Sequence, residues 1–174
     1  MFTALLILLY VQDELSYDIH YKNHKRIYRI ESEFNANNNQ DLYAIAPIPI
    51  GPAIQLEIPE IEKVVRFDRI NQEVFISGEK EYLEDNFFMA DSTVFDVFNH
   101  EFIAGNPNTC LTAPNSIVLT QSIAEKYFLD ENPMGEVLSI KNGESFKITG
   151  IIKNVKGNSH LKFDALISIS SDVE

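Results

Sequence analysis

The strongest constraint on the fold is at the N-terminus, where residues 2–11 (FTALLILLYV) form a run without a charged side chain. A run of this length is too short to cross a bilayer, which needs about 20 apolar residues. It also lacks the basic start and the small-residue cleavage site of a signal peptide. Three interpretations remain: a buried core helix or strand, an interfacial anchor, or the C-terminal part of a transmembrane helix.

The residues after the run favour the third interpretation. The run stops abruptly at Gln12-Asp13-Glu14, as a helix does on leaving lipid, and Tyr10 lies at that border, where aromatic side chains collect. Leu15 and Ile19 are four residues apart, which gives a continuing helix one apolar face. We therefore expect one stiff helix over residues 2–24, which would be roughly 35 Å long at 1.5 Å per residue.

The rest of the chain alternates between strand-like and helix-like segments. Interspersed segments of both kinds predict an α+β fold with mixed sheets rather than a doubly wound one. Strands are predicted at 25–34, 61–70, 116–119, 137–140, 145–153 and 161–169, together with a β-meander at 73–91. Helices are predicted at 47–58, from a cap at Asp91 or Ser92 through Phe98, and after the capping residue Thr120, with Ile123, Ala124, Tyr127 and Phe128 as one apolar stripe.

Composition excludes several classes of function. The formal charge is −12, which argues against nucleic-acid binding, because phosphate recognition needs clustered Lys and Arg. Cys110 is the single cysteine, so neither an intrachain disulfide nor a cysteine-based zinc site is possible. We expect Cys110 to be a small buried residue.

No catalytic constellation is evident in the sequence. His20 and His24 have the i, i+4 spacing of two metal ligands, but the segment reads HYKNH and lacks the glutamate base of a zinc protease. His100 and His160 are isolated in the sequence, and neither a nucleophile elbow nor a glycine-rich phosphate loop is found. The sequence therefore predicts a non-catalytic domain with no metal and no cofactor.

Basic side chains gather shortly after the apolar run. Contacts with lipid phosphates are one interpretation of this cluster. Ion pairs with neighbouring carboxylates are the interpretation that we favour, because the signs of charge are mixed along this segment. The cluster comprises Lys22, Lys25, Arg26 and Arg29, and the carboxylates are those of Asp13, Glu14 and Asp18.

Residues 12–34 (QDELSYDIHYKNHKRIYRIESEF) resemble the segment after the first membrane helix in MacB/FtsX-type ABC-transporter permeases, especially those of the Bacteroidetes type. Segments at 58–67, 87–107, 115–128, 132–140, 146–155 and 158–168 resemble the same family in the same order. The family-motif residues that the resemblance assigns to the stalk are Glu14, Leu15, Tyr17, Asp18, Asn23, Arg26, Tyr28 and Arg29; Ser16 and Ile27 also match, while His20-Tyr21 replaces the family's Phe-His pair.

The resemblance implies a particular architecture and location. The fold would be a MacB-like periplasmic core with a porter-like α/β subdomain and a smaller β-rich inserted subdomain near 72–114. Residues 1–12 would be the C-terminal part of a transmembrane helix, and residues 13–174 an extracytoplasmic domain. The domain would lie on the periplasmic side of a bacterial inner membrane.

The resemblance also implies a function. Such a domain couples cytoplasmic ATP hydrolysis to periplasmic events by mechanotransmission, with export, lipoprotein release or cell-wall hydrolase control as outcomes. Implied partners are a cytoplasmic ABC ATPase subunit or domain, a second permease copy in a homodimer, and a periplasmic or outer-membrane partner protein. The alternative is an extracytoplasmic sensor or ligand-binding domain of another membrane protein.

Overall fold

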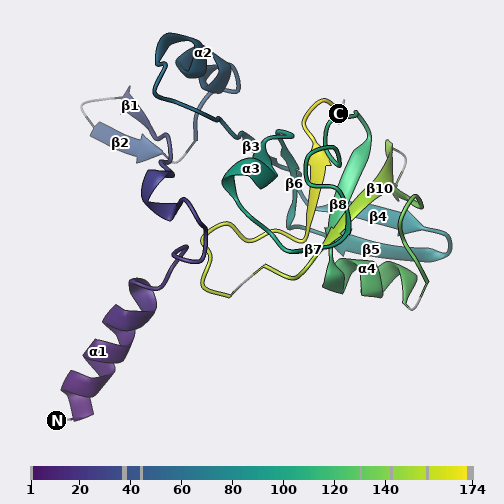
Figure 1. Ribbon diagram of the computed structural model, residues 1–174, viewed down its shortest axis with the longest axis horizontal. Helices are drawn as coiled ribbons and strands as arrows, with labels where there is room; N and C mark the ends of the chain where they lie inside the picture. Colours follow the sequence, from purple (N-terminus) through teal and green to yellow (C-terminus); the bar gives the residue numbers. More distant parts are fainter. Residues whose placement is uncertain are drawn as a thin grey trace.

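The computed structural model describes residues 2–36, 39–43, 45–129, 131–141, 143–155 and 157–171. A helix projects at the N-terminus, a hairpin and a short helix follow, and a mixed sheet with two helices forms the main body (Figure 1). The architecture confirms the predicted α+β class with an N-terminal helix.

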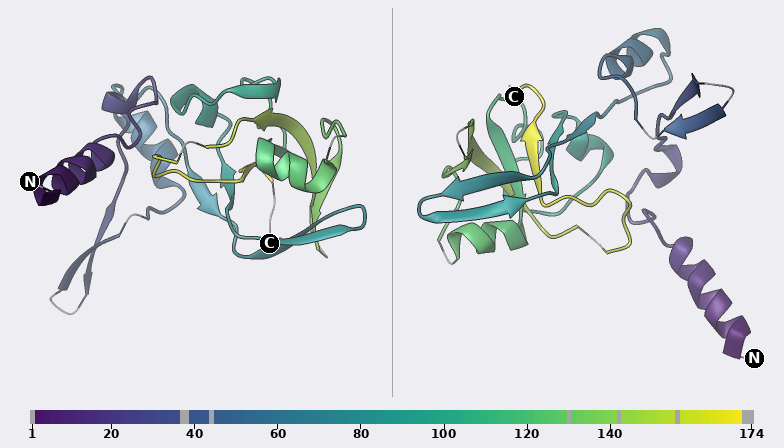
Figure 2. Two further views of the ribbon diagram at one scale, coloured as in Figure 1. Left: turned by 90° about the horizontal axis from the view of Figure 1, so that it is seen from below. Right: turned by 180° about the vertical axis from the view of Figure 1, so that it is seen from behind.

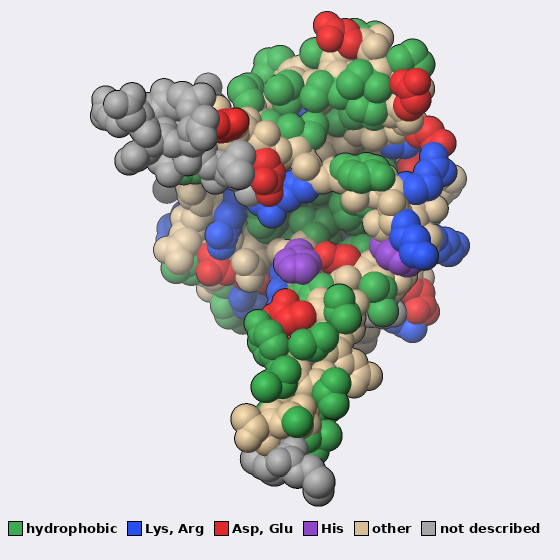
Figure 3. Space-filling view, turned by 90° about the vertical axis from the view of Figure 1, so that its left-hand side faces the viewer, with side chains coloured by type: hydrophobic (Ala, Val, Ile, Leu, Met, Phe, Trp, Pro, Cys, Tyr) green, Lys and Arg blue, Asp and Glu red, His purple; other side chains and the backbone are tan. Residues whose placement is uncertain are grey.

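The projecting helix, α1 (Phe2–Glu14), packs against nothing along most of its length (Figures 1 and 2). Its side chains from Leu5 to Val11 are each between 44% and 65% exposed, and Figure 3 shows this apolar surface extending from the rest of the molecule. Among the described residues, no helix is both long enough and apolar enough to cross a bilayer.

The helix predicted through residue 24 ends ten residues earlier than expected, at Glu14. The hydroxyl of Ser16 donates to the carbonyl oxygen of Asp13 (2.7 Å), and this local bond competes with continuation of the helix. Asp18 then adopts a left-handed conformation with φ of +57°. Residues 15–23 are therefore a series of turns, followed by the 3-10 helix η1 (His24–Arg26).

The predicted strand at 25–34 is mostly absent. After η1 the chain is extended without a strand partner until β1 (Ser32–Ala36), which pairs only with β2 (Asn39–Tyr43). Tyr28 is 86% exposed and Ile30 is 39% exposed, although their alternation predicted one buried face. Alternation gives a strand two faces, but a strand forms only where a second one supplies hydrogen bonds. The helix α2 (Ile50–Glu57) follows Pro49, as predicted.

The main sheet has nine strands in the described residues, in the order β3-β6-β11-β8-β10-β9-β4-β5, with β7 on β10. The pairs β8–β10 and β6–β11 are parallel and the others antiparallel, so the sheet is mixed as predicted. The strands are β3 (Phe67–Arg69), β4 (Glu73–Ser77), β5 (Lys80–Glu84), β6 (Phe87–Ala90), β7 (Phe102–Gly105), β8 (Ser116–Thr120), β9 (Val137–Ile140), β10 (Ser145–Ile152) and β11 (Ala165–Ser168).

The predicted meander at 73–91 is only partly correct. Strands β4 and β5 form the expected hairpin, with Gly78 at a φ of +59° in the turn. Strand β6 instead pairs with β3 and β11 at the other side of the sheet. The strands of 72–114 thus share one sheet with later strands, and a separate inserted subdomain there stays a prediction.

Both faces of the sheet carry an apolar core. One lies under α4 (Gln121–Phe128), whose predicted stripe of Ile123, Ala124, Tyr127 and Phe128 is buried, as expected. The other lies around α3 (Val94–Val97) and includes Cys110, which is buried as predicted. The central strands β8 and β11 are buried throughout, as expected for strands covered on both faces.

The prediction that Asp91 caps the helix is wrong, because its side chain bonds elsewhere. Thr93 precedes the first helical residue, and no side chain caps α3. The carboxylate of Asp91 instead accepts from the guanidinium of Arg66 at 2.6 and 2.9 Å, and from the backbone N–H of the same residue at 2.8 Å. These bonds fix the chain before β3 against the chain after β6.

Replacing Gly105 by Ala should lower the free energy of unfolding by more than about 3 kcal/mol. Gly105 has a φ of +93°, and an added Cβ would lie 2.5 Å from the carbonyl oxygen of Thr149 and 2.7 Å from the Cα of Gly150. Gly78→Ala is the control, since its φ is also positive but nothing lies within 4 Å, and it should cost about 1 kcal/mol. Urea denaturation measures both, and equal losses would show that the β7–β10 contact tolerates a side chain.

Candidate functional site

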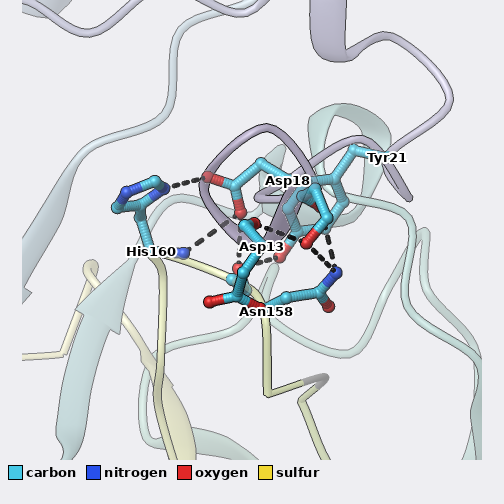
Figure 4. A network of polar contacts seen from close by, with 7 residues as sticks. Asp13, Asp18, Tyr21, Asn158 and His160 are labelled. Atoms are coloured by element: carbon cyan, nitrogen blue, oxygen red, sulfur yellow. Dashed lines mark hydrogen bonds and ion pairs between the residues drawn. The ribbon is translucent and has the colours of Figure 1, made fainter. Parts of the chain in front are cut away.

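The distinctive polar site of the molecule is the junction between the N-terminal segment and the loop after β10 (Figure 4). Asp18 is at its centre. Its Oδ1 accepts hydrogen bonds from the hydroxyl of Ser159 (2.7 Å) and from the backbone N–H of His160 (3.1 Å). Its Oδ2 lies 2.7 Å from Nδ1 of His160. One carboxylate therefore engages two consecutive residues of the loop.

Further bonds join the two segments around Asp18. The backbone N–H of Asp18 donates to the carbonyl oxygen of Asn158 (3.0 Å), and the side-chain amide of Asn158 donates to the carbonyl oxygen of Ser16 (3.0 Å). We call the contact between residues 16–21 and residues 158–160 the latch. It joins segments about 140 residues apart and lies just before β11, a central strand of the sheet.

Tyr21 anchors the latch in the domain. It is only 1% exposed, and its hydroxyl lies 3.1 Å from Oγ of Ser159. Its ring contacts Phe98 edge-on at 5.1 Å and His100 at 5.9 Å. Burial raises the pKa of Tyr21, so the hydroxyl stays protonated and available as a donor. The latch thus combines charged hydrogen bonds at its rim with aromatic packing beneath.

Two titratable groups at the junction have shifted pKa values. Partial burial of Asp18 acts to raise its pKa, but the hydrogen bonds from Ser159 and His160 outweigh it, so the pKa is lowered. Burial, with a smaller effect of His20, lowers the pKa of His100 to about 4. Asp18 is therefore an anion and His100 a neutral ring at neutral pH.

The buried ring of His100 should make the protein less stable in mild acid. A folded-state pKa of about 4 lies below the usual histidine value of about 6.5. The unfolded chain therefore binds more protons between these values, and stability falls as pH falls through that window. The loss from pH 7 to pH 5 should be about 2 kcal/mol. Urea denaturation should show it in the natural chain and not in His100→Phe; an equal loss in both would contradict this account.

The structure brings some of the predicted stalk residues into the latch. Tyr17 lies against the ring of His160, with centroids 4.6 Å apart, and Asp18 forms the central contacts. Glu14 is the last residue of α1, Leu15 follows it, and both are exposed.

The other predicted stalk residues lie outside the latch. The carbonyl oxygen of Asn23 accepts from the backbone N–H of Arg26, whose side chain forms an exposed ion pair with Glu62 at 2.5 Å. Tyr28 and Arg29 are exposed. A stalk role for these four residues stays a prediction.

Sequence reasoning missed the loop half of the latch. His160 is isolated in the sequence, and Asn158 and Ser159 read only as turn residues. The one available signal was that residues 14–18 and 158–168 both carry the family resemblance.

His20 and His24, whose spacing is that of two metal ligands, make separate contacts. The ring of His20 lies on that of Tyr21, with centroids 4.1 Å apart, while Nδ1 of His24 lies 3.0 Å from the carbonyl oxygen of Tyr21. Burial raises the pKa of Cys110 to about 11, so its thiol is protonated at neutral pH. Among the described residues, no group of three or more His, Cys, Asp and Glu side chains is placed to hold a metal ion.

Solved structures of permease domains resemble this fold. A domain of a permease protein from Porphyromonas gingivalis is 26% identical with a TM-score of 0.61, and the match covers 70% of this chain and 56% of that one. The periplasmic region of MacB from Actinobacillus actinomycetemcomitans is 18% identical with a TM-score of 0.52, and the match covers 70% and 55%. This chain thus matches little more than half the length of either relative, and a search of curated proteins finds no match.

A family model describes nearly the whole chain. The model is that of the MacB-like periplasmic core domain, and it matches residues 1–173. The fold, the order of the matching segments and this coverage agree with one another. This chain belongs to the family of MacB-like periplasmic core domains.

Proposed function

We propose that the chain is the extracytoplasmic domain of an ABC-transporter permease of the MacB/FtsX type and transmits movement of a membrane helix to the periplasmic side. Residues 1–12 are then the last part of that transmembrane helix, and residues 13–174 lie outside the bilayer. The observation that carries the proposal is the latch, which ties the end of α1 to the loop before β11.

The surface of α1 supports its place in lipid. The seven consecutive leucine, isoleucine, tyrosine and valine side chains from Leu5 to Val11 are all exposed, and seven consecutive residues cover every side of a helix. A surface helix of a globular domain has only one apolar stripe. A helix that is apolar all round, with nothing packed on it, fits a hydrocarbon environment.

Force would pass through a short rod and a fixed contact. The rod is α1, which ends at Glu14. Asp18 binds the loop 158–160, and β11 follows with neighbours on both sides, β6 and β8. Displacement of α1 therefore acts on the middle of the sheet. This replaces the continuous lever through residue 24 that the sequence predicted.

The proposal includes the partners that such a cycle needs. A cytoplasmic ABC ATPase supplies the energy, a second permease copy completes a homodimer, and a periplasmic or outer-membrane protein receives the movement. The domain itself is not an enzyme in this proposal. It lies on the periplasmic side of a bacterial inner membrane.

Purification of the full-length permease from membranes tests this function. An ATPase should co-purify with it, and protease added from the periplasmic side should cleave within residues 13–174. Cleavage only from the cytoplasmic side would contradict the proposed location. A single-span protein that purifies with a signalling domain would favour the alternative of an extracytoplasmic sensor.

A further inference from the structure

Most basic side chains in the described residues contact carboxylates or backbone carbonyls, as expected in a chain with a net charge of −12. Four exposed lysines have no carboxylate within ion-pair distance among those residues. They are Lys22, Lys25, Lys147 and Lys162.

Three of these four lysines flank the latch. Lys22 and Lys25 follow Tyr21, and Lys162 lies two residues after His160. Figures 1 and 2 show that α1 leaves the body at the same end at which the loop between β10 and β11 meets the N-terminal segment. The unpaired positive charge therefore gathers where the bilayer begins in the proposed function.

The local ion pairs that the sequence favoured do not form with these lysines. Asp18 binds Ser159 and His160 instead, and Arg26 pairs with Glu62. Asp13 and Glu14 lie at the end of α1, between the latch and the proposed bilayer, and they weaken the attraction of this end for an anionic surface without cancelling it.

We propose that Lys22, Lys25 and Lys162 form a basic collar that binds the anionic headgroups of the bilayer entered by α1. The collar rests on the proposed function, because it needs α1 in the membrane. A lysine near an anionic surface contributes about 1 kcal/mol, or about a fivefold gain in binding. Three lysines opposed by two carboxylates leave one net positive charge and should give about a fivefold preference for anionic over neutral vesicles.

Flotation of the whole 174-residue chain with vesicles tests the collar. One vesicle is phosphatidylcholine alone, and the other is phosphatidylcholine mixed with phosphatidylglycerol. The natural chain should bind both and prefer the second about fivefold, and added salt should remove the preference. The variant K22Q/K25Q/K162Q should lose the preference and keep its binding to the neutral vesicle.

The variant K63Q/K141Q/K147Q is the matched control, because it removes the same charge from other elements. It should retain the preference for the anionic vesicle. If both variants lose that preference, the preference depends on the net charge of the chain and not on the position of the lysines, and the collar is overturned. Equal binding of the natural chain to the two vesicles would also overturn it. Failure to bind the neutral vesicle at all would instead contradict the membrane role of α1, which is the separate claim of the proposed function.

Discussion

Replacing Asp18 by Ala should release the N-terminal segment from the domain while the main sheet stays folded. Amide hydrogen exchange of residues 16–21 should accelerate about 10- to 100-fold, which corresponds to about 1.4–2.8 kcal/mol of lost local stability. The carboxylate accepts from Ser159 and from the backbone of His160, and both donors lose their acceptor. Exchange within β8 and β11 should not change.

Two further substitutions at Asp18 separate the side chain from the backbone. The φ of +57° is strained for Ala but suits Gly and Asn. Asp18→Gly should therefore release the segment through loss of the carboxylate alone, and Asp18→Asn should retain most of the protection because one oxygen still accepts. Unchanged exchange in the Gly variant would mean that the carboxylate does not hold the latch.

Replacing Lys126 by Met should lower the free energy of unfolding by about 2–4 kcal/mol. Nζ of Lys126 lies 2.7 Å from Oε1 of Glu84, whose side chain is only 7% exposed, and 4.5 Å from the ring centroid of Tyr82. The variant leaves a buried carboxylate with the hydroxyl of Tyr127 (2.8 Å) as its remaining side-chain partner. Burial and the hydrogen bond to Glu84 raise the pKa of Tyr127, so its hydroxyl stays a donor.

The chain offers a matched control for this ion pair. Lys141 and Glu81 are also 2.7 Å apart, but both side chains are 48% exposed. Lys141→Met should therefore cost less than about 0.5 kcal/mol. Adding Glu84→Leu to Lys126→Met should recover part of the loss, because no uncompensated charge then remains. Equal losses from the two lysine variants in urea denaturation would show that burial of Glu84 does not set the cost.

The sequence predicted well those elements whose apolar residues pack against, or pair with, another element of the fold. The stripe Ile123, Ala124, Tyr127 and Phe128 faces the sheet, and the apolar run at 116–119 forms a central strand. The segment 25–34 is the counterexample. Its alternation is as clear as that of a true strand, but no neighbouring strand pairs with residues 27–31.

The latch was less predictable than the fold for a physical reason. Hydrogen bonds between two irregular segments leave no periodic pattern, and Asp18 and His160 are 142 residues apart. The left-handed turn at Asp18 is equally hidden, since Asp is compatible with both helix and turn. Both segments resemble known permeases, but the resemblance did not imply that they contact each other.

These contacts change the picture of how movement would reach the domain. A continuous helix through residue 24 would act as one long lever. The observed chain has a shorter helix, a turn at 15–17 and then the latch. In the proposed function, coupling would therefore depend on a few polar contacts rather than on helix stiffness. In the proposed function, Asp18 is thus the position at which coupling can be lost without loss of the fold.

The most direct measurement of this claim uses the full-length permease with its ATPase, with one spin label on α1 and one on β5. The native thiol of Cys110 is 3% exposed, so it should interfere little with labelling at introduced cysteines. The distance between labels should change when ATP hydrolysis is trapped in the natural protein. In Asp18→Gly, ATP hydrolysis should continue while the distance change is lost. An undiminished change in that variant would contradict the account.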